Sequence, residues 1–449
     1  MTSPKPLMTV SGVRGIVDES LTEYLCFKLA FIQTVVTGSK LVVVGRDTRP
    51  SGPRIAKAIF RGITAAGAQP VDLGVCPTPT TCLAARHFNA GTGVIITASH
   101  NPSPYNGYKM VHATGRLFND AECRSVYSRL DDNAVPPENR WLSYSADAKS
   151  ADAVTPHIDA ICRNVDVAAI RTAGVSVAID ATNGAAGVIF PTLLEKLGVD
   201  WQGVYTDLSG EFLRNPEPRP EHLTELADML KKNEKYWGGF AFDPDADRLA
   251  PMGEHGEPLT EELTLALALE CVLSATPGRV ATNLSTSMLV DDVATACKST
   301  VIRSKIGEAN VVETMLKNGC VMGGEGNGGV IYPPISTARD GLAALSLIIE
   351  RMAKTGKKMT GLASRWPTYT IVKEKIPLPG SGASMILKNL AVTYASERID
   401  VQDGLKITRT NGWVHIRPSN TEPIVRIIAE SRTENEARQM IQEIRKNIG

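Results

Sequence analysis

A serine, a histidine and a proline follow a short apolar run in the first quarter of the chain. Gly93–Ile96 is rich in β-branched residues, which predicts a buried strand. Pro102 ends the run, because proline donates no backbone hydrogen bond and biases Asn101 towards an extended or turn conformation. We therefore expect Ser99 and His100 at the tip of a strand, where a hydroxyl is easily positioned for group transfer. For this segment alone, a strand-to-loop turn without chemistry is the simpler interpretation.

Three carboxylates alternate along a loop in the middle of the chain. Asp243, Asp245 and Asp247 follow an apolar strand, and apolar residues on both sides predict that both ends of the loop enter a core. Crowded carboxylates repel each other unless a cation neutralises them, and Arg248 is the one cation in the loop. An EF-hand does not fit, because its sixth position requires glycine and here holds Arg248. The pattern favours Mg²⁺ acting on a phosphate, with Arg248 on a phosphoryl oxygen, over a solvated acidic turn.

A glycine-rich segment, Gly323–Gly329, contains an acid and an amide. Its glycines match a dinucleotide-binding pattern only weakly, because Tyr332–Pro334 prevents a helix from opening after it. A flexible loop that brings Glu325 and Asn327 to a polyhydroxyl ligand is the favoured interpretation, since carboxylates and amides bind hydroxyl groups. A plain glycine turn is the alternative.

Small polar residues between two predicted strands near the C-terminus could bind an anion. Ser419, Asn420 and Thr421 can aim hydroxyl and backbone N–H groups at one phosphate, and Arg417 and Arg426 can complete a clamp. An ordinary hairpin turn with incidental arginines explains this segment equally well when it is taken alone.

Two further cations lie close in sequence to these segments or to the N-terminus. Arg14 is flanked by glycine and valine residues, and Lys109 follows Ser99 by ten positions. Each could neutralise a phosphate or move a proton, although either one alone is more often a surface charge.

Composition limits the class of protein. The chain has 449 residues, 43% of them hydrophobic and 21% charged, with a formal net charge of zero. At roughly 100–200 residues per domain this length predicts two to four domains, and the zero net charge favours neither a nucleic acid nor a membrane as partner. The 8 cysteines include no Cys-x-x-Cys pair, which indicates buried thiols in a reducing cytosol. We see no apolar leader and no span of about 20 apolar residues, so a cytoplasmic enzyme is expected.

The elements that must position these residues alternate between short strands and helices. This rhythm predicts an α/β fold: three successive α/β domains with mixed, mostly parallel sheets, followed by a C-terminal α+β domain. The expected domains are residues 1–150, 151–255, 256–367 and 368–449, with a polar linker over Asp131–Ser150. Within them we expect a helix at Gly187–Leu197 and a strand at Cys320–Gly323.

Taken together, these segments resemble the loops of the α-D-phosphohexomutases, the family of phosphoglucomutase, phosphomannomutase and phosphoglucosamine mutase. Thr97–Pro102 is similar to the phosphoserine loop of that family, and Asp243–Arg248 to its Mg²⁺ loop. Gly324–Gly328 is similar to its sugar loop, and Arg417–Glu422 to its phosphate loop. The order and spacing agree over nearly the whole chain. The resemblance implies four domains around one cleft, each of which contributes a loop.

The resemblance also implies a role for each residue. Ser99 would carry the transferred phosphoryl group, and a phosphoserine oxygen would bind one Mg²⁺ together with Asp243, Asp245 and Asp247. Glu325 and Asn327 would bind sugar hydroxyls. The groups around the transferring phosphoryl group would be Arg14, His100, Lys109 and Arg248, with Lys109 the candidate for proton transfer, and those on the distal phosphate Arg417, Ser419, Asn420, Thr421 and Arg426.

The implied reaction interconverts hexose 1-phosphate and 6-phosphate through a 1,6-bisphosphate, which would also act as activator. The hexose could be glucose, mannose or glucosamine. Asn327 and Gly329 stand where most members carry serine and histidine, which resembles the archaeal-type branch and leaves the preferred hexose open. A non-catalytic phosphosugar-binding protein and a Mg²⁺-dependent sugar phosphatase on the same scaffold are the alternatives. We expect a monomer or a homodimer.

Overall fold

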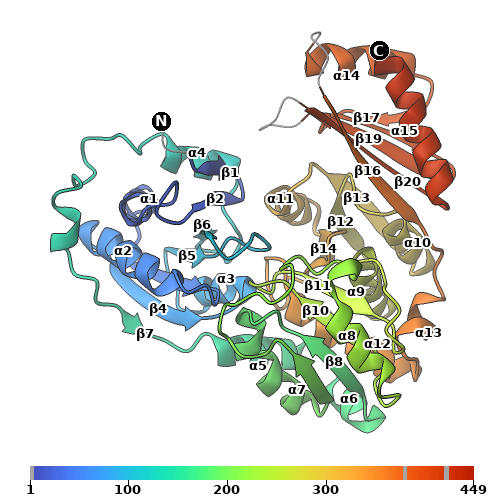
Figure 1. Ribbon diagram of the computed structural model, residues 1–449, viewed down its shortest axis with the longest axis horizontal. Helices are drawn as coiled ribbons and strands as arrows, with labels where there is room; N and C mark the ends of the chain where they lie inside the picture. The colour runs from blue at the N-terminus through green and yellow to red at the C-terminus, as the bar shows by residue number, and fades with distance from the viewer. Residues whose placement is uncertain (1–4, 378–381, 419–423, 449) are drawn as a thin grey trace.

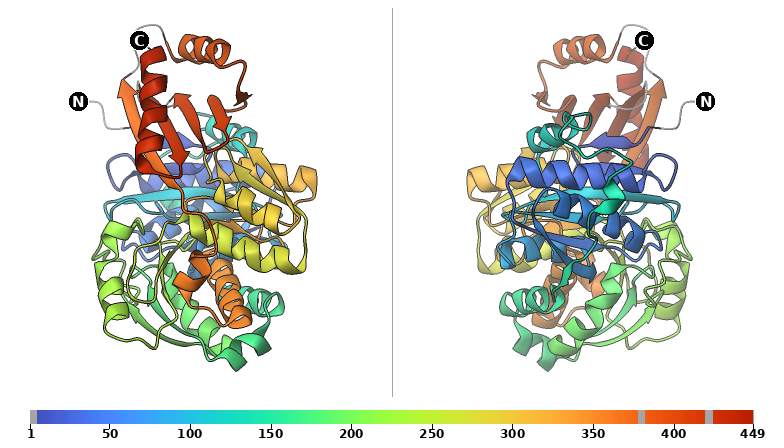
Figure 2. Two further views of the ribbon diagram at one scale, coloured as in Figure 1. Left: turned by 90° about the vertical axis from the view of Figure 1, so that its right-hand side faces the viewer. Right: turned by 90° about the vertical axis from the view of Figure 1, so that its left-hand side faces the viewer.

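The computed structural model describes residues 5–377, 382–418 and 424–448. These residues form four sheets, which we call the first, second, third and C-terminal units in chain order (Figure 1). Both views of Figure 2 show the C-terminal unit projecting from one end of the molecule. The mixed α/β architecture expected from the sequence is confirmed.

The first unit is built on a seven-stranded sheet with strand order β1-β2-β6-β5-β3-β4-β7. Its elements are β1 (Leu7–Thr9), β2 (Gly12–Ile16), α1 (Glu23–Thr37), β3 (Leu41–Arg46), α2 (Gly52–Ala65), β4 (Gln69–Val75), α3 (Thr78–His87), β5 (Thr92–Ile96), β6 (Tyr105–His112), α4 (Asp120–Tyr127), a 3₁₀ turn (Trp141–Ser143) and β7 (Lys149–Ser150). Val42 and Val44 pack with residues of α1 and α2, whereas Val43 packs with α3. Helices therefore cover both faces, which explains the continuous apolar run of β3.

The second unit has a four-stranded sheet, β11-β10-β8-β9, in which only the β10–β11 pair is antiparallel. Its elements are α5 (Val154–Arg163), α6 (Val167–Ala173), β8 (Ser176–Asp180), a 3₁₀ turn (Ala185–Val188), α7 (Phe190–Leu197), β9 (Asp200–Val204), a 3₁₀ turn (Pro220–His222), α8 (Thr224–Lys231), β10 (Gly239–Phe242) and β11 (Leu249–Met252).

The third unit repeats this plan with strand order β13-β12-β14-β15. Its elements are α9 (Glu262–Ala275), β12 (Arg279–Asn283), α10 (Leu289–Ala296), β13 (Thr300–Ser304), α11 (Glu308–Asn318), β14 (Met322–Glu325), β15 (Gly329–Ile331), α12 (Gly341–Thr355) and α13 (Met359–Ala363). Helix α12 packs against both α9 and α6. As a result, one continuous hydrophobic core, with Phe240, Leu265 and Leu345 among its members, joins the second and third units.

The C-terminal unit is a five-stranded antiparallel sheet in the order β16-β20-β19-β18-β17. Its elements are β16 (Thr370–Pro377), α14 (Ala383–Thr393), β17 (Arg398–Asp400), β18 (Leu405–Arg409), β19 (Gly412–Pro418), β20 (Ile424–Ser431) and α15 (Glu434–Ile448). It has its own core, to which α14 and α15 contribute Leu390 and Ile441.

Three local expectations differ from the structure. Gly187–Leu197 is not one helix: α7 starts only at Phe190, because Pro191 suits a first turn but not a helix interior. The strand expected at Cys320–Gly323 starts at Met322, since left-handed Gly319 ends α11 and Cys320 still bonds back to it. The linker at Asp131–Ser150 is partly structured, because Trp141 packs on the first unit and β7 joins its sheet.

Two further expectations concern thiols and membrane spans. All eight cysteines are free thiols, and six of them are buried. In the ranges that the structure describes, no helix combines the length and the apolar character needed to cross a bilayer.

Candidate active site

Ser99 lies three residues beyond the end of β5, in a left-handed backbone conformation with φ of 50°. Its backbone N–H donates to Thr97 Oγ1 at 2.8 Å, and the Thr97 hydroxyl in turn donates to Asp47 Oδ2 at 2.7 Å. The serine is 1% exposed, and its Oγ faces the second unit. A strained, hydrogen-bonded backbone thus fixes the direction of this hydroxyl.

A buried arginine holds the rest of the Ser99 loop. The guanidinium of Arg49 donates to the carbonyl oxygens of Ser99, Asn101, Pro102 and Tyr105 at 2.6–2.9 Å. A carbonyl cluster of this kind needs such a donor, because buried backbone oxygens without partners are costly. The sequence interpretation missed Arg49.

The three aspartates lie in the turn between β10 and β11, as the sequence predicted. One carboxylate oxygen from each of Asp243, Asp245 and Asp247 lies within 4.8 Å of the others, and all three side chains are buried. Ser99 Oγ donates to Asp243 Oδ2 at 3.1 Å. The structure therefore brings together the serine and the acidic residues, which are far apart in the sequence.

Two cations lie closer to the aspartates than Arg248 does. Lys109 Nζ is 2.6 Å from Asp245 Oδ2, and Arg339 Nη2 is 2.7 Å from Asp247 Oδ2. Arg248 Nε lies 3.7 Å from Asp247 Oδ1. The sequence interpretation named Arg248 and Lys109 but missed Arg339, because Arg339 is not a neighbour of the aspartates in sequence.

These charges set the protonation of the cluster. Burial acts to raise the pKa of Asp245 and of Asp247. Lys109, with a hydrogen bond from Thr78, outweighs it at Asp245, and Arg339 with Lys109 outweighs it at Asp247, so both pKa values lie below their ordinary range. The pKa of Asp243 is raised well above its usual value by burial and by the other two carboxylates. Without a further cation, the cluster has one carboxylate too many to keep ionised.

Two oxygen atoms in the cluster accept no hydrogen bond from the described residues. Among the described residues, neither Asp245 Oδ1 nor Asp247 Oδ1 accepts a hydrogen bond, although both are buried. In each carboxylate the other oxygen contacts a cation. Oxygens left bare in this way fit a hard divalent cation, so the residues present suit Mg²⁺.

Lys109 is held as an ammonium ion. Burial acts to lower its pKa, but Asp245 and Asp247 outweigh that effect and raise the pKa above its usual value. In this form the side chain can donate a proton but cannot accept one.

Arg14 and His100 border the same place. Arg14 Nη1 donates to Asn101 Oδ1 at 3.0 Å, and His100 Nδ1 lies 3.3 Å from Ser99 Oγ. Burial, with Arg248 adding to it, lowers the pKa of His100 to about 4, so the imidazole is neutral near pH 7.

The sugar-loop segment is a tight hairpin between β14 and β15. The expectation of a flexible loop, which was based on its glycines, was wrong. Glu325 ends β14 and accepts hydrogen bonds from Asn283 Nδ2 at 2.8 Å and from the Gly307 N–H at 3.2 Å. Gly328 has φ of +85°, and a Cβ there would clash with the carbonyl oxygen of Leu249. Gly328 therefore allows close packing against the start of β11, directly after the aspartate loop.

Two pockets meet at this hairpin. Both are lined by Ile306, Glu325 and Asn327. The smaller, of about 200 Å³, is also lined by cations near the aspartates, namely Arg14, Lys109, Arg248 and Arg339. The larger, of about 570 Å³, extends to the C-terminal unit, where its cations are Lys373, Lys375, Arg417 and Arg426, and Arg219 also lines it. The candidate site is thus a cleft with several basic side chains at each end.

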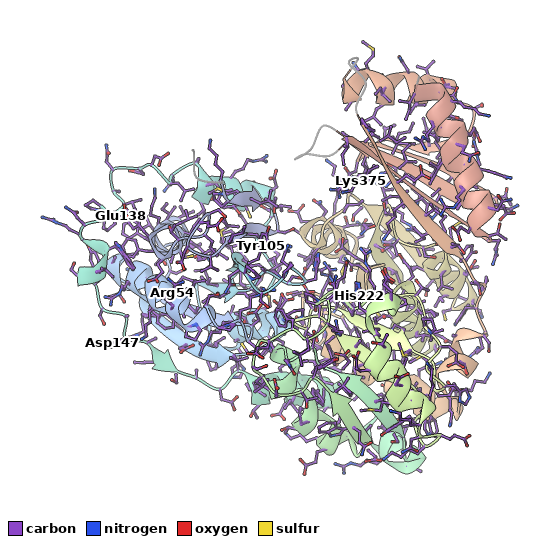
Figure 3. All side chains as sticks on the ribbon, in the orientation of Figure 1. Arg54, Tyr105, Glu138, Asp147, His222 and Lys375 are labelled. Atoms are coloured by element: carbon purple, nitrogen blue, oxygen red, sulfur yellow. The ribbon has the colours of Figure 1, made fainter. Side chains whose placement is uncertain are left out.

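Three basic side chains stand in register across the C-terminal sheet. Arg426 on β20 pairs with Lys375 on β16 and with Arg417 on β19. Lys375 is labelled in Figure 3, at the edge of the C-terminal unit nearer the third unit. Arg417 Nε donates to Asp403 Oδ1 at 3.1 Å. Ser419, Asn420 and Thr421 lie outside the described residues.

The sequence could have signalled Arg49 but not Arg339. Strands β3 and β5 are parallel neighbours, so Asp47, Arg49 and Thr97 follow the carboxyl ends of adjacent strands. Arg339 precedes the start of α12 and no pattern marks it as buried.

Models of known families match almost the whole chain. In order, they are the phosphoglucomutase/phosphomannomutase α/β/α domains I, II and III over residues 5–135, 155–256 and 261–369, and the C-terminal domain over residues 374–447. The domain limits predicted from the sequence stay predictions.

Individual relatives give the same picture. The chain is 35% identical over 439 residues to a phosphoglucomutase/phosphomannomutase of Thermococcus kodakarensis, with 96% of each chain covered. It is 31% identical to a probable phosphoglucosamine mutase of Methanopyrus kandleri, covering 96% of this chain and 95% of the relative. A crystal structure of a putative phosphomannomutase from Thermus thermophilus superposes with a TM-score of 0.83 at 27% identity, covering 99% of both chains. The chain therefore belongs to the phosphoglucomutase/phosphomannomutase family of phosphohexomutase enzymes.

Proposed function

We propose that this chain interconverts hexose 1-phosphates and hexose 6-phosphates through a phosphoryl group carried on Ser99. The observation that carries this proposal is the contact of Ser99 Oγ with Asp243, beside two buried aspartate oxygens that accept no hydrogen bond from the part of the chain that the structure describes. A binding protein would need neither a donor hydroxyl nor a site for a divalent cation next to it. In the forward direction, the bond from Ser99 Oγ to phosphorus breaks as the 6-hydroxyl of the sugar binds phosphorus. The return transfer moves the 1-phosphoryl group of the bisphosphate to Ser99.

Residues of the first and second units stabilise the transferring group in this proposal. Asp243, Asp245 and Asp247, with an oxygen of phosphorylated Ser99, would hold one Mg²⁺, which supplies positive charge to the phosphoryl oxygens when bound. Lys109 is an ammonium ion here, so it suits charge stabilisation and proton donation.

Three further groups complete this end of the cleft. Arg14 and Arg248 border the smaller pocket and can bind phosphoryl oxygens. His100 is neutral near pH 7 and lies close to Ser99 Oγ, so it can accept a proton.

The two-pocket cleft suits a ligand with a phosphate at each end. Glu325 and Asn327, between the pockets, would bind sugar hydroxyls, and Arg417 and Arg426 would bind the phosphate that does not react. Ser419, Asn420 and Thr421 are proposed for the same phosphate on the sequence alone. When the bisphosphate reverses its orientation in the cleft, its other phosphate becomes the reacting one. Added hexose 1,6-bisphosphate would activate the enzyme by phosphorylating Ser99.

The experiment is a coupled assay on the 1-phosphates of glucose, mannose and glucosamine side by side, with release of inorganic phosphate measured in parallel. We expect isomerisation of at least one sugar and little free phosphate. Phosphate release without isomerisation would make the protein a phosphatase, and binding without turnover would remove the catalytic proposal.

A further inference from the structure

Arg339 is a buried guanidinium that contacts both the metal loop and the sugar hairpin. Its Nη2 lies 2.7 Å from Asp247 Oδ2. Its Nη1 donates to Glu325 Oε2 at 3.1 Å and to Asn327 Oδ1 at 3.3 Å. The side chain lines the smaller pocket but is only 8% exposed. One cation is thus shared by a candidate metal ligand and by both candidate sugar-binding residues.

A further acidic residue fixes the position of this guanidinium. Glu308, at the start of α11, accepts from the Arg339 backbone N–H at 2.9 Å and from its Nε at 3.0 Å. The stem also fills the space beside the hairpin, because a Cβ added at Gly329 would clash with Arg339 Cδ. A side chain at position 329 and the observed Arg339 therefore exclude each other.

Asp340, the residue after Arg339, is also held by buried contacts. Asp340 caps α12 through Oδ1, and its Oδ2 lies 2.8 Å from His157 Nε2. His157 Nδ1 lies 2.8 Å from Thr80 Oγ1. All three side chains are fully buried. Since Thr80 belongs to the first unit and His157 to the second, this chain of contacts ties Arg339 to all three α/β units.

We propose that Arg339 is a positioning residue that couples the sugar hairpin to the metal loop. It orients Glu325 and Asn327 for the sugar and, by offsetting charge on Asp247, weakens the attraction of the aspartates for Mg²⁺. Only arginine presents enough N–H donors in a rigid fork to contact these groups at once. The proposal rests on the proposed function, in which these residues bind a phosphosugar and Mg²⁺.

The test uses Arg339→Gln and Arg339→Lys in the full chain, with Arg351→Gln as matched control. Arg351 lies on α12 and pairs with Glu270, away from the cleft. Calorimetry gives the Kd of Mg²⁺ without sugar, and separately the Kd of a hexose 1-phosphate. In Arg339→Gln we expect Mg²⁺ to bind about tenfold more tightly, because a nearby positive charge is lost, and the sugar phosphate to bind more weakly. Arg339→Lys keeps the charge, so Mg²⁺ should bind as in the wild type while the sugar phosphate still binds more weakly.

A merely structural role of Arg339 would not shift the two Kd values in opposite directions. A damaged fold would weaken both, and that result in Arg339→Gln would overturn the proposal. If Arg339→Gln fails to fold, Arg339→Lys is the deciding variant. If Arg339→Lys bound the sugar phosphate as tightly as the wild type does, the proposed coupling would be overturned. Both readouts are equilibrium constants, so they stand even if the wild type turns over no hexose phosphate, a result that would refute the proposed function alone.

Discussion

Ser99 Oγ donates to Asp243 Oδ2 across 3.1 Å, although the two residues belong to different sheets and lie 144 positions apart. A phosphoryl group on Ser99 would bring at least one further negative charge against this carboxylate. Burial and its neighbours already raise the pKa of Asp243, so the cluster cannot accept that charge without a cation. In the proposed mechanism, phosphorylation of Ser99 and binding of Mg²⁺ would therefore depend on each other.

Replacing Ser99 with alanine should abolish mutase activity without unfolding the protein. The hydroxyl is the only group at this position that can carry the phosphoryl group, so we expect turnover to fall by at least about three orders of magnitude. Intact-mass analysis of the wild type should show a phosphorylated fraction that maps to Ser99 and is absent from the variant. Ser103, an exposed serine in the same loop, is the matched control. Full activity in Ser99→Ala would remove this residue from the mechanism.

Removing one charge from the aspartate cluster should weaken metal binding. Asp245 offers one bare oxygen, Oδ1, and pairs Lys109 with the other. We expect Asp245→Asn to bind Mg²⁺ at least about tenfold more weakly and to lose most turnover. Wild-type activity should vanish with EDTA and return with added Mg²⁺.

The control for this prediction is Asp200→Asn, at an exposed aspartate paired with Lys235. It should leave Mg²⁺ binding unchanged. Turnover that persists in metal-free buffer would contradict the metal assignment.

The sequence predicted those site residues whose place depends only on their neighbours in the chain. Ser99 lies three residues after β5 and Asp243 directly after β10, and short apolar strands are strong signals, so their places could be predicted from the sequence. It failed where a residue acts across units. The role of Arg339 depends on its contacts with Asp247 and Glu325, which lie on other elements. No local sequence pattern predicts such long-range contacts.

Backbone conformation was equally hard to predict where packing decides it. The segment Gly323–Gly329, with five glycines among seven residues, was expected to be a flexible loop. Instead β14 pairs with β15, and the Leu249 N–H donates to the Gly328 carbonyl oxygen, so the segment is a tight hairpin. Likewise, alternation of strands and helices predicted separate domains, but it does not reveal that α12 joins the second and third units into one core.

Acid should destabilise the contact between the third and C-terminal units through His415. Its Nε2 lies 2.7 Å from the carbonyl oxygen of Asp403 and donates to it, so Nδ1 accepts from Ser285 Oγ at 2.8 Å. Burial lowers the pKa of His415 from 6.5 to about 4. Between these values the unfolded chain binds a proton that the folded chain does not, so the free energy of unfolding falls as the pH is lowered. The loss is on the order of 3 kcal/mol and is complete below pH 4.

Denaturant unfolding at pH 7 and at pH 4.5 measures this effect. His415→Gln should show a smaller loss of stability on acidification than the wild type, because its side chain does not titrate. His255→Gln, at an exposed histidine, should behave as the wild type. An equal loss in wild type and His415→Gln would show that this imidazole does not govern the acid response.

The last prediction concerns the phosphate that does not react. Arg426 stands between Lys375 and Arg417 in the C-terminal sheet and lines the larger pocket, away from Ser99. Binding a remote phosphate positions the reacting hydroxyl, so Arg426→Ala should raise KM for hexose 1-phosphates about tenfold to a hundredfold and lower kcat as well. Phosphorylation of Ser99 by a small activated phosphate donor should remain nearly intact, because that donor does not reach the C-terminal unit. Arg438→Ala, at an exposed arginine of α15 paired with Glu434, is the control. If Arg426→Ala left KM and kcat unchanged for every hexose phosphate, the assignment of Arg417 and Arg426 to a phosphate clamp would be wrong.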